Sequence, residues 1–269
     1  MLLSASFYLS VLLYIGASAL LIKAIVTSES TSATPPRSYL VACLAVIFHL
    51  IYLREISFPD LALNLSLSSM AVLVSGLVTL IFVAAGLVMP IRRLGVIVFP
   101  ITITCLIFSE LWPSPKQLLG SDSVWLASHI VVSLLAYSLI TIATIQALIY
   151  WYQDRQIKAK KEAKLLNVMP PLQTMDSLWF RLTLLGFGFL TLALASGAFF
   201  SQEIFGAPFA FKHHIVLTIC GWLVFALLLS KRLSMGLRGL EALVWTGAGF
   251  LFIQLGYFGT KLVSESLLP

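Results

Sequence analysis

The sequence predicts an all-α fold, a polytopic membrane helix bundle with about eight transmembrane helices and both termini extracytoplasmic. The composition is 59% hydrophobic and 10% charged, with a mean hydropathy of +1.00. Soluble domains carry about 25% charged residues. This chain has far fewer, so it does not resemble them. Apolar runs long enough to cross a bilayer recur along the sequence, and basic residues gather in alternate gaps between these runs.

The predicted spans follow one another with turn-forming residues between them. The first span has no Lys or Arg before it and no convincing cleavage site, so we expect it to be retained and not removed as a signal peptide. Prolines punctuate three gaps, within 34–37, 89–93 and 112–115, and residues 152–175 form the only long polar connection. The expected spans are about 5–25, 38–53, 63–88, 91–112, 124–151, 177–200, 213–230 and 238–262. We treat residues 1–269 as a single transmembrane domain.

The positive charges predict the orientation of these spans. Thirteen Lys and Arg residues fall on one side of the membrane and four on the other. Cytoplasmic loops are enriched in these residues, so the richer side, which includes the 152–175 connection, is predicted to be cytoplasmic. The protein is therefore expected in the bacterial inner (plasma) membrane as a multi-pass protein, with the lipid bilayer as its main partner.

The sequence argues against several other classes of protein. The net charge is +6, and the basic residues lie in short segments between apolar runs. This distribution is typical of residues that set membrane topology and argues against a nucleic-acid partner. The three cysteines, Cys43, Cys105 and Cys220, lie in apolar stretches and form no C-x-x-C motif. No phosphate-binding loop, nucleophile elbow or H-E-x-x-H motif is present, and we expect no enzymatic activity.

Small residues on two predicted helices indicate close helix packing. The eighth span carries a stripe at spacings of three and four, and the sixth span is rich in glycine and serine. Small side chains let helices approach closely in lipid. The residues are Thr246, Gly249, Ile253, Gly256 and Thr260 in the eighth span, and Gly186, Gly188, Ser196, Gly197 and Ala198 in the sixth.

Two intramembrane histidines are the candidate cofactor ligands. His49 precedes Arg54 by five residues and His129 follows Asp122 by seven, so both lie about 7–10 Å below the predicted outer surface at about 1.5 Å per residue. Histidine inside a bilayer marks a functional site by default. Two imidazoles at one depth suit axial coordination of haem iron. The alternative is that each histidine only satisfies a hydrogen bond to a neighbouring helix, and His213 and His214 at an outer boundary need no further explanation.

The second half of the chain, about residues 120–265, resembles the cytochrome c assembly family of membrane proteins. This is the CcsA/CcmC/HemX type, and especially its YpjD-like branch. The segments that carry the resemblance are 128–137 around His129, Met169–Leu172 with Met175-Asp176, and the glycine-rich 185–197. In the first half, 48–55 around His49 and 63–67 are similar to the YpjD-like branch.

The resemblance implies a haem site near the outer face. It implies haem b as cofactor, with His49 and His129 as axial ligands of the iron. In synthase-type members an external tryptophan-rich segment presents haem to apocytochrome. Here the equivalent residues 201–212 carry phenylalanines in place of the tryptophans, and Lys212 replaces the motif's aspartate. The remaining external aromatic shelf is formed by Phe205, Gly206, Phe209 and Phe211.

These features predict an inner-membrane haem-binding protein that is accessory to cytochrome c assembly and is not itself a haem-attaching synthase. Haem-delivery or cytochrome assembly proteins are its expected partners. The alternative is a non-catalytic membrane scaffold or complex subunit without a cofactor. A small-molecule transporter ranks last, because the span centres are almost free of the ionisable residues typical of transporters.

Overall fold

The computed structural model describes residues 5–27, 37–58, 63–89, 91–112, 118–119, 124–160, 169–199 and 213–266. Within these ranges, eight helices are long and apolar enough to cross a membrane. The prediction of an all-α, polytopic membrane helix bundle is therefore confirmed, and the chain is a multi-pass membrane protein. The predicted outward placement of both termini stays a prediction.

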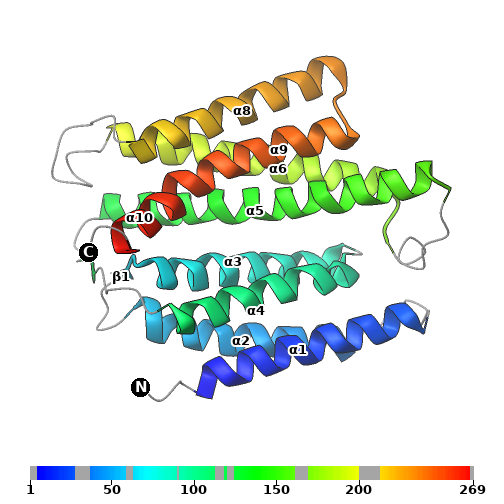
Figure 1. Ribbon diagram of the computed structural model, residues 1–269, viewed down its shortest axis with the longest axis horizontal. Helices are drawn as coiled ribbons and strands as arrows, with labels where there is room; N and C mark the ends of the chain where they lie inside the picture. Colours follow the sequence, from blue (N-terminus) through cyan, green and yellow to red (C-terminus); the bar gives the residue numbers. More distant parts are fainter. Residues whose placement is uncertain are drawn as a thin grey trace. The chain divides into compact units, whose positions relative to one another are not determined.

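The chain forms two compact units, each described here by itself. Unit 1 contains four long helices and a short pair of strands. Within it α1 packs against α2 and α4, and α3 packs against α2 and α4 (Figure 1). The strands pair antiparallel, with Leu63 opposite Leu119. The elements are α1 (Ala5–Val26), α2 (Arg37–Ser57), β1 (Leu63–Asn64), α3 (Leu67–Val88), a 3₁₀ turn (Arg92–Leu94), α4 (Gly95–Leu111) and β2 (Leu118–Leu119).

Local chemistry sets the limits of α3. Ser66 is its N-cap, and the Ser66 hydroxyl accepts a hydrogen bond from the backbone N–H of Ser69. Such a cap satisfies one of the backbone donors that the first helical turn leaves unpaired. The helix ends at Val88, and the C-cap Met89 has an extended backbone, as expected of a residue that precedes a proline in the sequence. Half of the α3 span is buried, more than for any other described span.

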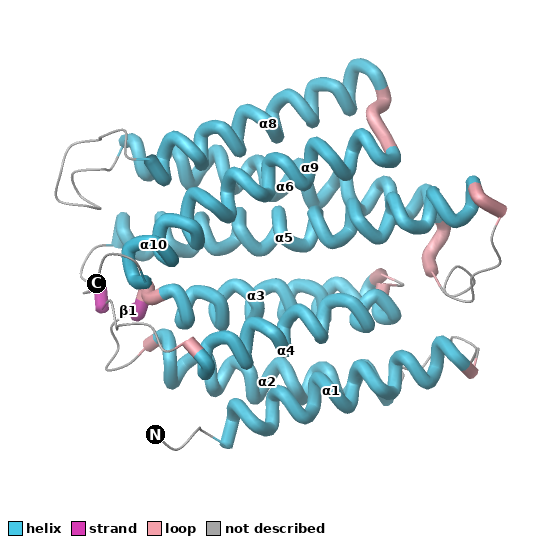
Figure 2. Tube along the Cα trace, in the orientation of Figure 1, coloured by secondary structure: helices cyan, strands magenta, loops and turns pink. Residues whose placement is uncertain are grey.

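Unit 2 contains the remaining long helices. Its largest interface joins α5 to α6, and α9 packs against both α5 and α8. Figure 2 shows this unit as helix throughout its described part, apart from short connecting turns. The elements are α5 (Val124–Lys158), α6 (Leu172–Phe199), α8 (His213–Met235), α9 (Gly239–Gln254), a π-helical segment (Leu255–Gly259) and α10 (Thr260–Ser266).

Several helix limits differ from the predicted spans, including those of α2, which ends at Ser57 and not at 53, and α8, which ends at Met235 and not at 230. Helix α5 continues to Lys158 and α6 begins at Leu172, whereas the apolar runs indicated an end at 151 and a start at 177. The Nζ of Lys158 lies 2.7 Å from Oδ2 of Asp154, four residues earlier on α5. Such pairs support exposed helical turns. A hydropathy pattern marks only the apolar part of a helix and so missed these polar turns.

Close helix contacts confirm the predicted packing role of Gly249 and Gly186 in unit 2. A Cβ added at Gly249 would lie 2.6 Å from Cε2 of Phe225, and one at Gly186 would lie 2.8 Å from Cγ1 of Ile140. No real Cβ fits at these distances, so α9 approaches α8, and α6 approaches α5, because these residues lack a side chain. At Gly188 a Cβ would meet nothing within 4 Å, so this glycine plays no such role.

Candidate functional site

His49 lies on α2 in the interior of unit 1 and is fully buried. Its Nδ1 is 3.2 Å from the hydroxyl oxygen of Tyr14 on α1, and its Nε2 is 3.2 Å from the carbonyl oxygen of Val72 on α3. A carbonyl oxygen only accepts hydrogen bonds, so Nε2 carries the proton. The unprotonated Nδ1 of the neutral ring then accepts from the Tyr14 hydroxyl.

Both nitrogens of His49 are therefore used inside unit 1. A Cβ added at Gly76 would lie 3.2 Å from Nε2, so α3 runs directly against the ring. Coordination of iron by either nitrogen requires the loss of the bond to Tyr14 or to Val72. The geometry of His49 is that of a buried polar side chain that joins three helices, and its role as an iron ligand stays a prediction.

His129 lies on α5 in unit 2 and is partly buried. Its Nδ1 is 2.9 Å from the hydroxyl oxygen of Ser196 on α6. The neighbouring Gly197 also contacts the ring, because a Cβ at that position would lie 3.3 Å from Cε1 of His129. The predicted ligand is thus held against α6 by a polar contact and by the absence of a side chain.

The other two histidines open α8. The His213 and His214 rings are 5.8 Å apart and nearly perpendicular. His213 is exposed, and the backbone carbonyl of His214 accepts a hydrogen bond from the Thr218 hydroxyl. The expectation that they need no ligand role stays a prediction.

The structure does not bring the two predicted ligands into one described unit. His49 belongs to unit 1 and His129 to unit 2, so their pairing at one depth stays a prediction. The predicted aromatic shelf of Phe205, Gly206, Phe209 and Phe211 lies outside the described residues. Among the described residues, no three His, Cys, Asp or Glu side chains gather around a common point. Axial coordination of haem needs two side chains at most.

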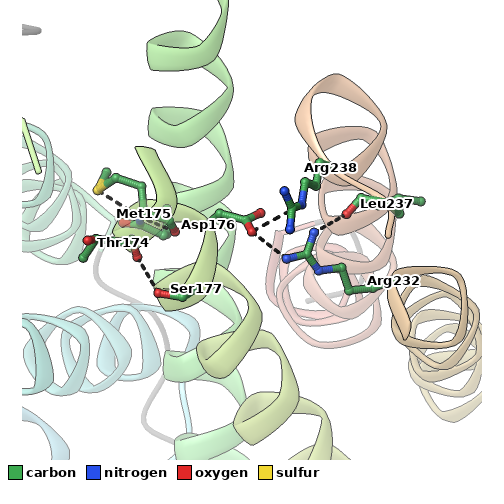
Figure 3. Close-up of polar contacts among 8 residues, drawn as sticks. Thr174, Met175, Asp176, Ser177, Arg232, Leu237 and Arg238 are labelled. Atoms are coloured by element: carbon green, nitrogen blue, oxygen red, sulfur yellow. Dashed lines mark hydrogen bonds and ion pairs between the residues drawn. The ribbon is translucent and has the colours of Figure 1, made fainter. Parts of the chain in front are cut away.

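A buried ionic cluster in unit 2 was not predicted from the sequence (Figure 3). Oδ2 of Asp176 on α6 is 2.5 Å from Nη2 of Arg232 on α8 and 3.6 Å from Nε of Arg238. Arg232 also donates from Nη1 to the carbonyl oxygen of Leu237, at 2.8 Å. Its guanidinium lies 5.6 Å from the ring centroid of Trp179, close enough for a cation–π interaction.

The sequence contains the charges of this cluster but does not show that they pair. Asp176 is a carboxylate beside a predicted apolar span, and Arg232 and Arg238 flank the last two spans on the same predicted side. Charges at one membrane surface are free to pair, but hydropathy does not say which helices are neighbours. The contact between α6 and α8 decides the pairing.

Comparison with known proteins places these features in a family. The sequence profile described as "Cytochrome C assembly protein" matches residues 36–268. The chain belongs to the cytochrome c assembly protein family. The match includes both His49 and His129 and extends well beyond the 120–265 stretch of the predicted resemblance.

Individual relatives within the family agree with this assignment. The inner membrane protein YpjD of Escherichia coli (strain K12) is 30% identical over 230 residues, which cover 83% of this chain and 85% of YpjD. The cytochrome c biogenesis protein CcsA of Chlamydomonas reinhardtii is 28% identical over 148 residues, 54% of this chain and 40% of that protein. A 28.8 kDa protein of Azospirillum brasilense is 28% identical over 179 residues, 65% and 66% of the two chains. No solved structure matches this chain.

Proposed function

We propose that this chain is a haem-handling protein of the bacterial inner membrane that acts as an accessory to cytochrome c assembly, with His129 as a ligand of the iron of haem b. The observation that carries the proposal is the Ser196–Gly197 contact around His129, in a chain that belongs to the cytochrome c assembly protein family. Family membership alone supports a role in assembly. The contacts of His129 support this histidine as the residue that binds haem.

The residues around His129 fit this cofactor. Histidines that bind metals commonly hold one ring nitrogen in a hydrogen bond while the other nitrogen coordinates, and Ser196 supplies such a bond to Nδ1. The apolar side chains of a membrane bundle accommodate a porphyrin. Bound haem would supply a redox-active iron, and the protein would supply the imidazole and its orientation. His49 remains the predicted second axial ligand, at the cost of one of its two bonds in unit 1.

The proposed role is that of an accessory without enzymatic activity. The segment 201–212 has phenylalanines where synthase-type members carry tryptophans, and it has Lys212 where they carry aspartate. It therefore lacks the indole donors and the carboxylate with which those proteins present haem. The proposed partners are haem-delivery or cytochrome assembly proteins. This part of the proposal rests on the family alone.

The direct test is haem binding by the purified full-length chain. The protein is solubilised in mild detergent, haem is added, and the Soret band is titrated for the wild type, His129→Ala, His49→Ala and His213→Ala. We expect a Soret band for the wild type and for His213→Ala, and its loss in His129→Ala. A low-spin spectrum that becomes high-spin in His49→Ala supports two axial histidines. A wild-type protein without a Soret band, or one indifferent to His129→Ala, contradicts the proposal.

A second candidate function is a membrane scaffold without a cofactor. The hydrogen bonds of His49 favour it, because they explain this histidine completely by helix packing. A partner that co-purifies equally well with the wild type and with the His49→Ala, His129→Ala double variant, in the absence of a Soret band, would support the scaffold.

A further inference from the structure

We propose that the turn between α8 and α9 in unit 2 is a binding site for a phosphate group, with Arg238 and Lys231 as its cations. The turn joins two helices that are long and apolar enough to span a membrane, so the headgroup of an anionic phospholipid is the phosphate that it would meet first. The proposal concerns unit 2 alone and does not depend on the proposed haem function.

Arg232, the most buried cation near this turn, is fully engaged inside the protein. Its Nη2 donates to Oδ2 of Asp176 and its Nη1 donates to the carbonyl oxygen of Leu237. Only 11% of its side chain is exposed. Hydrogen bonds between a guanidinium and a carboxylate are among the strong ones. Arg232 therefore holds α8 against α6 and is not the residue that would bind a ligand.

Arg238 reaches the same carboxylate but keeps its donors (Figure 3). Its Nε lies 3.6 Å from Oδ2 of Asp176, which is too long for a hydrogen bond, and 66% of its side chain is exposed. In the part of the chain that the structure describes, its terminal nitrogens bond to no acceptor. One carboxylate thus faces two guanidiniums, and a positive charge is left over. The planar fork of a guanidinium matches two oxygens of a phosphate.

Lys231 places a second cation against α9. Its Nζ lies 4.5 Å from the centre of the Trp245 ring, which is about two turns along α9 from Arg238. Lys231 belongs to none of the ion pairs found between described residues. The cation–π contact therefore orients the ammonium group without neutralising it. Tryptophan is enriched at the level of lipid headgroups, so this pair suits a site for a lipid phosphate.

The carboxylates at this end of unit 2 leave that positive charge in place. Asp176 and Asp154 are each paired with another basic side chain, at 2.5 and 2.7 Å. Glu241, in the first turn of α9, is exposed and takes part in no ion pair with a described residue. The side chain of the N-cap residue, Arg238, makes no capping hydrogen bond. The positive end of the α9 dipole therefore adds to the attraction for an anion.

The test is thermal unfolding of the full chain in mild detergent at constant ionic strength. Phosphatidylglycerol, zwitterionic phosphatidylcholine or inorganic phosphate is added in rising amounts. A ligand that binds only the folded state raises the midpoint of unfolding, and we expect this rise with phosphatidylglycerol and not with phosphatidylcholine. A comparable rise with inorganic phosphate supports the site with free phosphate as its ligand. No rise with phosphatidylglycerol or with inorganic phosphate overturns the proposal.

Substitutions distinguish a defined site from diffuse attraction to basic residues. Near an anionic membrane surface, one basic residue contributes about fivefold in affinity. Arg238→Gln and Lys231→Gln should therefore each need about five times more ligand for half of the rise in midpoint. The matched control is Arg155→Gln, which should leave the titration unchanged. Arg155 also lies over a tryptophan ring, that of Trp151 at 5.5 Å, but in the last turn of α5. An equal effect in all three variants, or none in Arg238→Gln, overturns the proposal.

Discussion

The carboxylate of Asp176 and the guanidinium of Arg232 form an ion pair between α6 and α8, with 2.5 Å between Oδ2 and Nη2. Only 10% and 11% of the two side chains are exposed. The indole of Trp179, one turn along α6, donates to the Thr246 hydroxyl on α9 at 3.1 Å. Together these contacts connect three helices of unit 2.

Removal of this carboxylate should destabilise the protein severely. In Asp176→Ala the buried guanidinium of Arg232 has lost its anion, and such losses cost about 3–5 kcal/mol. We expect a large drop in the midpoint of thermal unfolding in detergent, followed by tryptophan fluorescence. Arg238→Gln is the control, because the Arg238 side chain is 66% exposed and exposed pairs contribute about 0–1 kcal/mol. Equal midpoints for the two variants would contradict a buried, strong pair.

Tyr14→Phe should weaken unit 1 through His49. The substitution keeps the ring and removes only the hydroxyl that donates to Nδ1, so an imidazole nitrogen is left buried and unsatisfied. We expect a loss of about 1–3 kcal/mol in the free energy of unfolding, measured by urea titration in mixed micelles. Tyr8→Phe on the same helix is the matched control, because Tyr8 is 49% exposed. A Tyr14→Phe protein as stable as Tyr8→Phe would show that the buried hydroxyl contributes little.

Two glycines on α6 should respond to alanine in opposite ways. Gly186→Ala places a Cβ 2.8 Å from Ile140 and forces α5 and α6 apart, whereas Gly188→Ala meets nothing within 4 Å. Alanine exceeds glycine in helix propensity by about 1 kcal/mol. Gly188→Ala should therefore be neutral or stabilising in thermal unfolding, while Gly186→Ala destabilises by about 1–3 kcal/mol, as overpacking does. The reverse order would refute the close approach of these helices.

The predicted orientation is open to a direct test with topology reporters. Alkaline phosphatase folds to an active enzyme only on the extracytoplasmic side. A fusion after residue 269 should be active, and a fusion after Lys160, in the connection between α5 and α6, should be inactive. This follows from the division of Lys and Arg into thirteen and four. Activity in the opposite fusion would reverse the orientation and place both candidate histidines near the cytoplasmic face.

Composition, hydropathy and motif resemblance determined a large part of this description. A bilayer requires long apolar helices whose backbone bonds are satisfied internally, so each span is visible in the local sequence. That requirement located eight spans and the two intramembrane histidines, and the segments around His49 and His129 indicated the family. Polar extensions such as Arg155–Lys158 escaped the same method, because nothing apolar marks them.

Tertiary structure alone decided what each candidate side chain contacts. Spacing along the chain could not show that His49 bonds to Tyr14 and Val72, or that His129 meets the hydroxyl of Ser196. It also could not select Arg232 as the partner of Asp176. These contacts join residues on different helices, and helix packing in lipid depends on the shape of whole surfaces and not on local hydropathy. The sequence determined which residues lie in the membrane spans. The packing of the helices determined which atoms those residues contact.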